Sequence, residues 1–350
     1  MLAKSSVNMK DELRTCYDLS PSDGAFRDTE DIYSALRNII PEEEWYIYAP
    51  YIVNINRLKK DRSAVLLAHN YMTPEIYYGV SDFRGDSLQL AMCACKVEED
   101  VIVQCGVHFM AETSKILNEN KKVLIPDSRA GCSLASSITA EDVYRMRSQN
   151  PGARVVSYVN TSAEVKAASD VCCTSSNVVD VINAMDSDIV IVTPDQYLAQ
   201  NALPHVSKKL VIWEGSCEVH EKFTDAEIIQ LRDLHDGLYV MAHPECPPDV
   251  LASADFSGST SAMIQQVKAS GAKKVAMITE CSMSDNVAAE YPDIDFIRPC
   301  NLCPHMKRIT LENILWSLHS MTEEVVVDSD IIVSARLAIT RMIDISLGVK

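Results

Sequence analysis

The sequence predicts an α/β protein of three homologous three-layer αβα domains with short parallel sheets, in a pseudo-threefold arrangement around a central active site. Nine runs rich in branched apolar residues alternate with segments long enough to form helices. This alternation is typical of parallel sheets covered by helices on both faces. The runs also recur at a constant period, and a small polar cluster follows the first run of each period. These three observations together define the fold class.

The nine predicted strands fall into three sets of three. They cover residues 64–70, 100–107 and 121–128, then 153–160, 188–195 and 208–215, then 238–245, 273–280 and 294–300. The first strands of the three sets start at 64, 153 and 238, which are 89 and 85 residues apart, and the other strands keep nearly the same spacing. A period this constant indicates three copies of one α/β unit.

The repeat divides the core of the chain into three α/β domains at 64–150, 151–236 and 237–320. Residues 1–63 have no counterpart in the repeat, so we expect a partly helical N-terminal extension. Within it we expect an amphipathic helix at 29–40 and disorder over about the first 20 residues. Residues 321–350 contain a helix with an apolar stripe, which should pack on the core.

Composition limits the class of protein. The chain has 350 residues, 47% of them hydrophobic, which suffices for two or three packed domains. A net charge of −17 argues against a nucleic-acid partner and against an anionic membrane surface. The first residues lack the apolar segment of a signal peptide, and no run of about 18 apolar residues predicts a membrane helix. We therefore expect a cytoplasmic protein whose 12 cysteines form no disulfide framework.

A polar cluster after each first strand is expected to open a helix. The three clusters are "GDSLQLA" (85–91), "TSSNVVDVI" (174–182) and "GSTSAMIQQ" (258–266). Free N–H groups and the helix dipole at such a helix start bind anions. The candidate ligands for carboxylate or phosphate oxygens are Ser87, Ser175, Ser259 and Thr260.

One cysteine follows the third strand of every unit, at Cys132, Cys217 and Cys303. Ligands of open α/β sheets bind beyond the carboxyl ends of the strands, so the three thiols should converge near the threefold axis. Three such thiolates suit a [4Fe–4S] cluster, which is usually held by four cysteines. With three, one iron stays open and can act as a Lewis acid.

Other interpretations of the cysteines stay open at this point. Cys300 and Cys303 form a CxxC pair, which could be a redox couple, although such pairs usually open a helix. A structural zinc site normally shows two paired motifs, and only one CxxC exists here. Cysteines in apolar stretches, such as Cys172 and Cys173, are interpreted as buried hydrophobic residues. Lys307 and Arg308 follow Cys303 and could anchor a substrate, but a charged pair next to a strand end usually lies on the solvated surface, which is the expectation here.

The first strands end in polar residues, namely His69, Tyr71, Tyr158, Asn160, His243 and Glu245, and His220 follows Cys217 by three residues. Of these, the His, Tyr and Glu side chains can transfer protons near neutral pH. The predicted cavity therefore combines an open iron, acid–base groups and anion-binding helix starts. Its ligand should be a small molecule with several negative charges.

Several longer motifs carry a resemblance to a known family. "LLAHNY", "DFRGDSLQLA", "GVHFMAETSKIL", "WEGSCEVHE" and "CPHMKRITLENIL" occur in this order. Over residues 60–320 the chain resembles the quinolinate synthase A family. The resemblance implies three α/β domains, a [4Fe–4S] cluster, and condensation of iminoaspartate with dihydroxyacetone phosphate to quinolinate in NAD biosynthesis, with loss of phosphate and two waters. It also implies a functional link to L-aspartate oxidase, which would supply iminoaspartate.

The family's functional positions match this chain motif by motif. The resemblance implies cluster ligands at Cys132, Cys217 and Cys303. It implies substrate and acid–base roles for His69, Tyr71, Ser87, Tyr158, Asn160, Ser175, His220, His243, Glu245, Ser259 and Thr260. We take Tyr71 and Glu245 as the proton-transfer candidates, with the three histidines holding anions. Some family members have CxxCxxC near the last ligand and are thought to be regulated by a disulfide, but this chain has only CxxC, so we expect Cys300 to pack near the cluster.

Rival functions come from other classes. An aconitase-like hydro-lyase also uses a three-cysteine cluster, but the helix starts favour a phosphorylated substrate. An iron–sulfur electron carrier would need a fourth cysteine ligand, and a DNA-binding sensor would need a basic patch. A binding module without metal would give a colourless protein when purified anaerobically.

Overall fold

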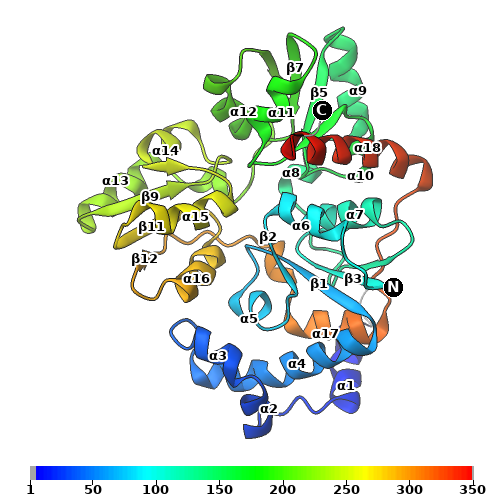
Figure 1. Ribbon diagram of the computed structural model, residues 1–350, viewed down its shortest axis with the longest axis vertical. Helices are drawn as coiled ribbons and strands as arrows, with labels where there is room; N and C mark the ends of the chain where they lie inside the picture. Colours follow the sequence, from blue (N-terminus) through cyan, green and yellow to red (C-terminus); the bar gives the residue numbers. More distant parts are fainter. Residues whose placement is uncertain (1–4, 349–350) are drawn as a thin grey trace.

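The computed structural model describes residues 5–348 and shows three α/β lobes grouped around a common centre (Figure 1). The first lobe is drawn mainly in cyan, the second in green and the third in yellow, and the N-terminal helices in blue lie below the first lobe. No helix among the described residues is long and apolar enough to cross a membrane.

Each lobe contains one four-stranded sheet, and every pairing between neighbouring strands is parallel. The first sheet has the order β2 (Phe83–Gly85), β1 (Ala64–His69), β3 (Val101–Cys105), β4 (Lys122–Leu124). The second has β6 (Val171–Cys173), β5 (Arg154–Tyr158), β7 (Ile189–Thr193), β8 (Lys209–Ile212). The third has β10 (Phe256–Ser257), β9 (Leu238–Ala242), β11 (Lys274–Ile278), β12 (Asp295–Ile297). The same order in all three sheets confirms the predicted α/β class.

All nine predicted strands are present, although each is shorter than its apolar run. The edge strands β2, β6 and β10 were not predicted. Each has only two or three residues, too few to show a periodic pattern, and pairs with the first strand of its lobe. Each edge strand leads directly towards the polar cluster of its lobe, so it fixes where that cluster begins.

Helices cover the sheets, and their bounds are as follows. The first lobe has α5 (Pro74–Tyr77), α6 (Ser87–Ala94), α7 (His108–Leu117) and α8 (Ser133–Ser136), and α17 (Leu311–Ser320) returns to it and contacts β3. The second has α9 (Ala140–Gln149), which contacts β5, with α10 (Ala163–Ala167), α11 (Val178–Ala184), α12 (Gln196–Ala202) and 3₁₀ turns at Leu203–His205 and His220–Lys222. The third has α13 (Asp225–Leu234), which contacts β9, with α14 (Pro248–Ser253), α15 (Thr260–Ser270), α16 (Cys281–Glu290) and a 3₁₀ turn at Met306–Arg308.

The N-terminal extension is helical, as predicted, but more ordered than predicted. It forms α1 (Ser5–Cys16), α2 (Asp23–Asp28), α3 (Glu30–Leu36) and α4 (Glu42–Asp61). The expected disorder is wrong from residue 5 onwards, because α1 lies against α17 and buries Leu13; residues 1–4 lie outside the described part. The helix expected at 29–40 is α3, which already ends at Leu36.

The C-terminal segment packs on the core, as predicted. Helix α18 (Ser329–Ser346) lies against α10 and β6 of the second lobe and also against α7 of the first. Just before it, the backbone N–H of Val325 donates to the carbonyl of Val123 at 2.8 Å, which extends the edge of β4. The tail therefore joins two lobes. The domain boundaries proposed from the sequence fall between these elements and remain a proposal.

Candidate active site

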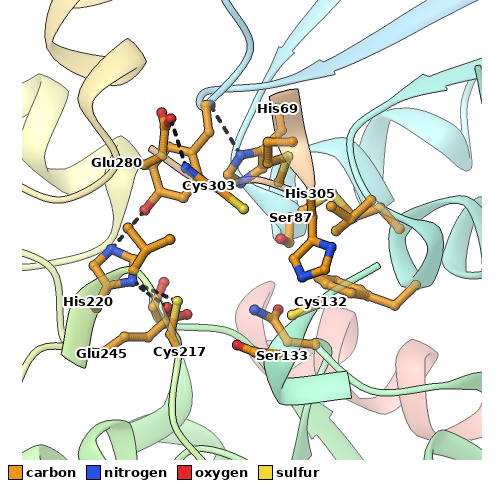
Figure 2. Close-up of a pocket in the computed structure, with 18 of the residues that line it drawn as sticks. His69, Ser87, Cys132, Ser133, Cys217, His220, Glu245, Glu280, Cys303 and His305 are labelled. Atoms are coloured by element: carbon orange, nitrogen blue, oxygen red, sulfur yellow. Dashed lines mark hydrogen bonds and ion pairs between the residues drawn. The ribbon is translucent and has the colours of Figure 1, made fainter. Parts of the chain in front are cut away.

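One cavity lies where strand ends of the three sheets meet, and the space between its lining atoms measures about 700 Å³ including its mouth. Every site residue proposed from the sequence lines it except Ser259. The lining includes His69, Tyr71, Ser87 and Cys132 from the first lobe, Tyr158, Asn160, Ser175, Cys217 and His220 from the second, and His243, Glu245, Thr260 and Cys303 from the third. Figure 2 labels seven of them, whose side chains surround the cavity: His69, Ser87, Cys132, Cys217, His220, Glu245 and Cys303.

Ser259 has a local structural task instead. Its hydroxyl accepts the backbone N–H of Ala262 at 3.4 Å and so caps α15. The neighbouring Thr260 does line the cavity, and its hydroxyl accepts a hydrogen bond from the Asn70 amide at 2.8 Å. At this helix start, one hydroxyl is used for capping and the next is directed to the cavity.

The other two polar clusters also differ in detail from the prediction. Helix α6 begins at Ser87 and is capped by Asp86, so the Ser87 hydroxyl is not needed as a cap. Helix α11 begins only at Val178, because the Asn177 amide oxygen accepts the N–H of Thr174 at 2.6 Å and closes a turn. Ser175 therefore lies in a turn before the helix and not at its start.

The three cysteines Cys132, Cys217 and Cys303 have closely similar surroundings. Burial raises the pKa of all three thiols, that of Cys132 to about 12. Two backbone N–H groups oppose this rise at each sulfur, and they come from the residues two and three positions further along the chain: Leu134 and Ala135, Val219 and His220, and His305 and Met306. Such N–H groups stabilise sulfur in its anionic, metal-binding form.

The segments that carry these cysteines also contact one another. The Ser133 hydroxyl donates to the carbonyl of Ser216 at 3.2 Å and accepts the N–H of Glu218 at 3.1 Å. The Glu218 carboxylate lies 2.9 Å from the His305 imidazole Nε2. One side of the cavity is therefore closed by contacts between loops of all three lobes.

Cys300 is not free, contrary to our expectation that it merely packs near the site. It forms a disulfide with Cys281 at the start of α16, with the two Cα atoms 5.0 Å apart. Strands β11 and β12 are parallel neighbours, so the residues beyond their ends meet although they are 19 positions apart. Cys303 remains free, and a CxxC disulfide between Cys300 and Cys303 is therefore not the state seen here.

Glu245 is the hub of the acid–base groups. Its Oε2 lies 2.7 Å from His220 Nδ1, and its Oε1 accepts the Tyr158 hydroxyl at 2.5 Å. Burial alone would raise the pKa of Glu245, but the neighbouring imidazoles of His220 and His243 and these hydrogen bonds hold that pKa well below its usual range. The carboxylate is therefore charged at neutral pH.

A chain of hydrogen bonds connects Glu245 with Tyr71, the other proton-transfer candidate. His220 Nε2 lies 3.0 Å from the Thr279 hydroxyl, which in turn lies 2.7 Å from the Tyr71 hydroxyl. Burial, with the charge of Glu245, raises the pKa of Tyr71 well above 10. The chain Glu245–His220–Thr279–Tyr71 can therefore hold a proton at several atoms along one side of the cavity.

The histidines His69 and His243 are uncharged at neutral pH. Burial lowers the pKa of His69 to about 4 and that of His243 to about 3, although the Glu245 charge opposes both shifts. They offer neutral ring nitrogens as hydrogen-bond donors or acceptors. A bound anion would favour their charged form.

Sequence reasoning missed several polar residues of the cavity wall. They are Asp86, Ser133, Thr174, Glu218, Glu280 and His305. The search concentrated on residues that follow first and third strands, whereas Glu280 follows the second strand of its lobe. A search beyond all three strands of each unit would have found it, because the carboxyl ends of parallel strands lie on the same edge of the sheet.

Comparison with known proteins decides the family. The family model described as "Quinolinate synthetase A protein" matches residues 53–344. The chain belongs to this family. Relatives named "Quinolinate synthase" include those of Sinorhizobium medicae, 55% identical over 94% of this chain and 91% of the relative, and of Xylella fastidiosa, 56% identical over 83% and 86%. The relative from Agrobacterium fabrum is 54% identical over 90% and 91%.

Membership of the quinolinate synthetase A family confirms the resemblance seen in the motifs and makes the chain an enzyme. The family motifs converge on the cavity: "LLAHNY" supplies His69 and Tyr71, "WEGSCEVHE" supplies Cys217 and His220, and "CPHMKRITLENIL" supplies Cys303. Motifs that lie far apart in the sequence of this family member therefore form one site.

Proposed function

We propose that the chain is a quinolinate synthase that condenses iminoaspartate with dihydroxyacetone phosphate in NAD biosynthesis. The products are quinolinate, one phosphate and two waters, which together account for all atoms of the two substrates. We further propose a [4Fe–4S] cluster held by Cys132, Cys217 and Cys303. The observation that carries this proposal is the convergence of three free thiols from equivalent loops on one cavity, each facing two backbone N–H groups.

The residues present fit a cluster with three protein ligands. Among the described residues that line the cavity, no fourth cysteine occurs. When bound, such a cluster supplies an open iron that acts as a Lewis acid towards a substrate oxygen. Cys217, His220 and Glu245 also lie close enough together to hold a single metal ion. However, His220 and Glu245 already bond to each other, and this group leaves the equivalent positions of Cys132 and Cys303 unexplained.

The polar wall suits a substrate with carboxylate and phosphate groups. Hydroxyls of Ser87, Ser175 and Thr260 line it, together with the N-terminal ends of α6 and α15. The amide oxygen of Asn160 is buried without a partner among the described residues, so it can accept a hydrogen bond from a bound ligand.

The acid–base groups suit a condensation followed by loss of water. Forming the carbon–carbon bond requires removal of a proton from carbon, and each loss of water requires a proton for the departing oxygen. Glu245 is charged and orients the Tyr158 hydroxyl and the His220 ring by hydrogen bonds, and Tyr71 and Tyr158 are protonated at neutral pH because burial raises their pKa well above 10. The proton removed from carbon would pass to the His220–Glu245 pair. Apolar side chains, among them Phe109 and Met306, complete the wall and limit the access of water to these groups.

We also propose the setting in which the enzyme works. It would act in the cytoplasm on small molecules, without nucleic acid or membrane, and depend on an L-aspartate oxidase reaction for unstable iminoaspartate. The net charge of −17 supports the absence of a nucleic-acid partner.

The test is iron and acid-labile sulfide content, with a visible spectrum, on protein purified anaerobically. The parent should contain about four irons and four sulfides per chain. Cys132→Ala, Cys217→Ala and Cys303→Ala should each lose most of the iron and at least about a hundredfold of quinolinate formation. Cys95→Ser is the matched control, because Cys95 is exposed and does not line the cavity.

Two results would contradict the proposal. One is a single zinc in the parent that disappears in His220→Ala and Glu245→Gln, which would assign the metal to the group around Cys217. The other is full activity of Cys217→Ala after anaerobic reconstitution. Activity with a citrate-like acid in place of dihydroxyacetone phosphate would favour the hydro-lyase alternative.

A further inference from the structure

Glu280 lies between β11 and α16, and its side chain has no solvent exposure. Its Oε1 accepts the backbone N–H of Cys303 at 3.4 Å, and its Oε2 accepts the N–H of Ser282 at 3.0 Å, which caps α16. A single carboxylate thus connects the third lobe with the segment that carries the third cavity cysteine. Figure 2 shows Glu280 and Cys303 side by side at the cavity.

Lys307 extends this connection to the first lobe. Its ammonium group lies 2.9 Å from Glu280 Oε1 and donates to the Ser282 hydroxyl at 2.6 Å and to the carbonyl of Tyr71 at 2.8 Å. The expectation that Lys307 is a solvated surface residue is therefore wrong. Thr279, the residue before Glu280, holds the Tyr71 hydroxyl, so Tyr71 is fixed at its backbone and at its side chain.

This arrangement is found in one lobe only among the described residues. The position two residues beyond the second strand is Val107 in the first lobe and Asp195 in the second, where it pairs with Gly215 much as Glu280 pairs with Asn301. One oxygen of Asp195 caps α12, and the other is buried without a partner. Among the described residues, neither Val107 nor Asp195 forms an ion pair with a lysine or arginine near a cavity cysteine, as Glu280 does with Lys307.

The segment that carries Cys303 also differs from the other two cysteine segments in its remaining hydrogen bonds. Ser133 joins the segments of Cys132 and Cys217 directly to each other through two hydrogen bonds. The Cys303 segment has no such bond to the Cys132 segment among the described residues. It contacts the Cys217 segment through His305 and Glu218 and the first lobe through Lys307, whereas the hydrogen bond to the Cys303 backbone and the disulfide both run to the start of α16. The placement of Cys303 therefore depends mainly on that helix.

We propose that Glu280, together with Lys307, is a positioning residue that fixes Cys303 and Tyr71 relative to each other. The inference deepens the proposed function, because Cys303 is there a cluster ligand and Tyr71 a proton-transfer group. A buried ion pair with several additional hydrogen bonds is suited to this role, since its geometry is fixed by all of its contacts.

The experiment measures how readily Cys303 reacts in folded, metal-free protein. Iodoacetamide is added without reductant, so that the Cys281–Cys300 disulfide persists. Tandem mass spectrometry then compares carboxamidomethylation at Cys303 with that at Cys132 and Cys217. In Glu280→Gln, the labelling of Cys303 relative to Cys132 and Cys217 should rise about tenfold. The reason is that the backbone around Cys303 loses its hydrogen bond to a charged carboxylate.

Lys307→Met provides a second variant, since Lys307 is partly exposed and its loss is less disruptive to folding than a change at Glu280. It should raise the Cys303 ratio in the same direction. Asp195→Asn is the matched control, because it alters a buried helix-capping carboxylate at the equivalent position and should leave the labelling of Cys303 relative to Cys132 unchanged. Circular dichroism establishes that each variant is folded.

An unchanged ratio in both variants would overturn the inference, as would an equal rise at all three cysteines, which indicates general loosening. A second measurement is the rate of iron loss to a chelator after reconstitution, which should be faster in Glu280→Gln. If the parent holds no iron, the proposed function fails, whereas the labelling ratios still decide the role of Glu280.

Discussion

Acidification should destabilise the metal-free protein through two buried histidines. His69 and His243 both line the cavity and come from different lobes, and burial lowers their pKa values to about 4 and about 3. In the unfolded chain both titrate near 6.5. Between these values the unfolded state binds protons that the folded state does not. The two histidines therefore leave the free energy of unfolding unaffected above about pH 6.5 and lower it progressively as the pH falls towards 4.

The magnitude follows from the two pKa values. At pH 5, each histidine lowers the free energy of unfolding by about 2 kcal/mol relative to pH 7.5. The two together account for about 4 kcal/mol, which is a large part of the stability of a typical protein. Other groups titrate in the same range, so the contribution of the histidines has to be measured as a difference between variants.

The assay is urea unfolding of the metal-free protein at pH 7.5 and pH 5. In His69→Gln and in His243→Gln the loss on acidification should be smaller than in the parent by about 2 kcal/mol each. His205→Gln is the control, because His205 is exposed and should leave the loss unchanged. If both histidine variants lost as much unfolding free energy between pH 7.5 and pH 5 as the parent does, the conclusion that these imidazoles are buried and neutral would be refuted.

Three further predictions address other contacts. Lys166→Met should lower the free energy of unfolding by about 1–3 kcal/mol, as urea unfolding can measure, because the buried carbonyl of Thr161 loses the Lys166 ammonium group that donates to it. Tyr158→Phe should lower kcat/KM for quinolinate formation at least about tenfold, since Glu245 loses a charge-assisted hydrogen bond, and unchanged kinetics would exclude that role. Thr224→Ala should cost about 1 kcal/mol by removing the cap of α13, seen as a lower Tm with unchanged iron content.

The repeated pattern explains why so much of the fold followed from the sequence. Buried parallel strands such as β1 are continuous apolar runs, and three copies of each signal made the assignment redundant. The same repetition identified Cys132, Cys217 and Cys303, because a chemically distinctive residue recurred at one position of the unit. Residue type and strand order were sufficient for these conclusions.

The repeated sequence pattern does not show in which direction a side chain points or which distant segments contact each other. Ser259 and Thr260 are adjacent and chemically similar, yet one caps α15 and the other lines the cavity, because their directions at the helix start differ. The start of α11 depends on a turn closed by Asn177, which competes locally with the helix.

The sequence by itself determined the α/β class, the threefold repetition, the convergence of three thiols and most residues of the cavity wall. These features depend on local periodicity and on the rule that parallel strands present their carboxyl ends on one edge. Only the tertiary structure decided that Cys300 pairs with Cys281 and that Glu280 and Lys307 link Cys303 to Tyr71. The physical reason is that these contacts join segments through single atoms, whose meeting depends on how the third lobe packs against the first.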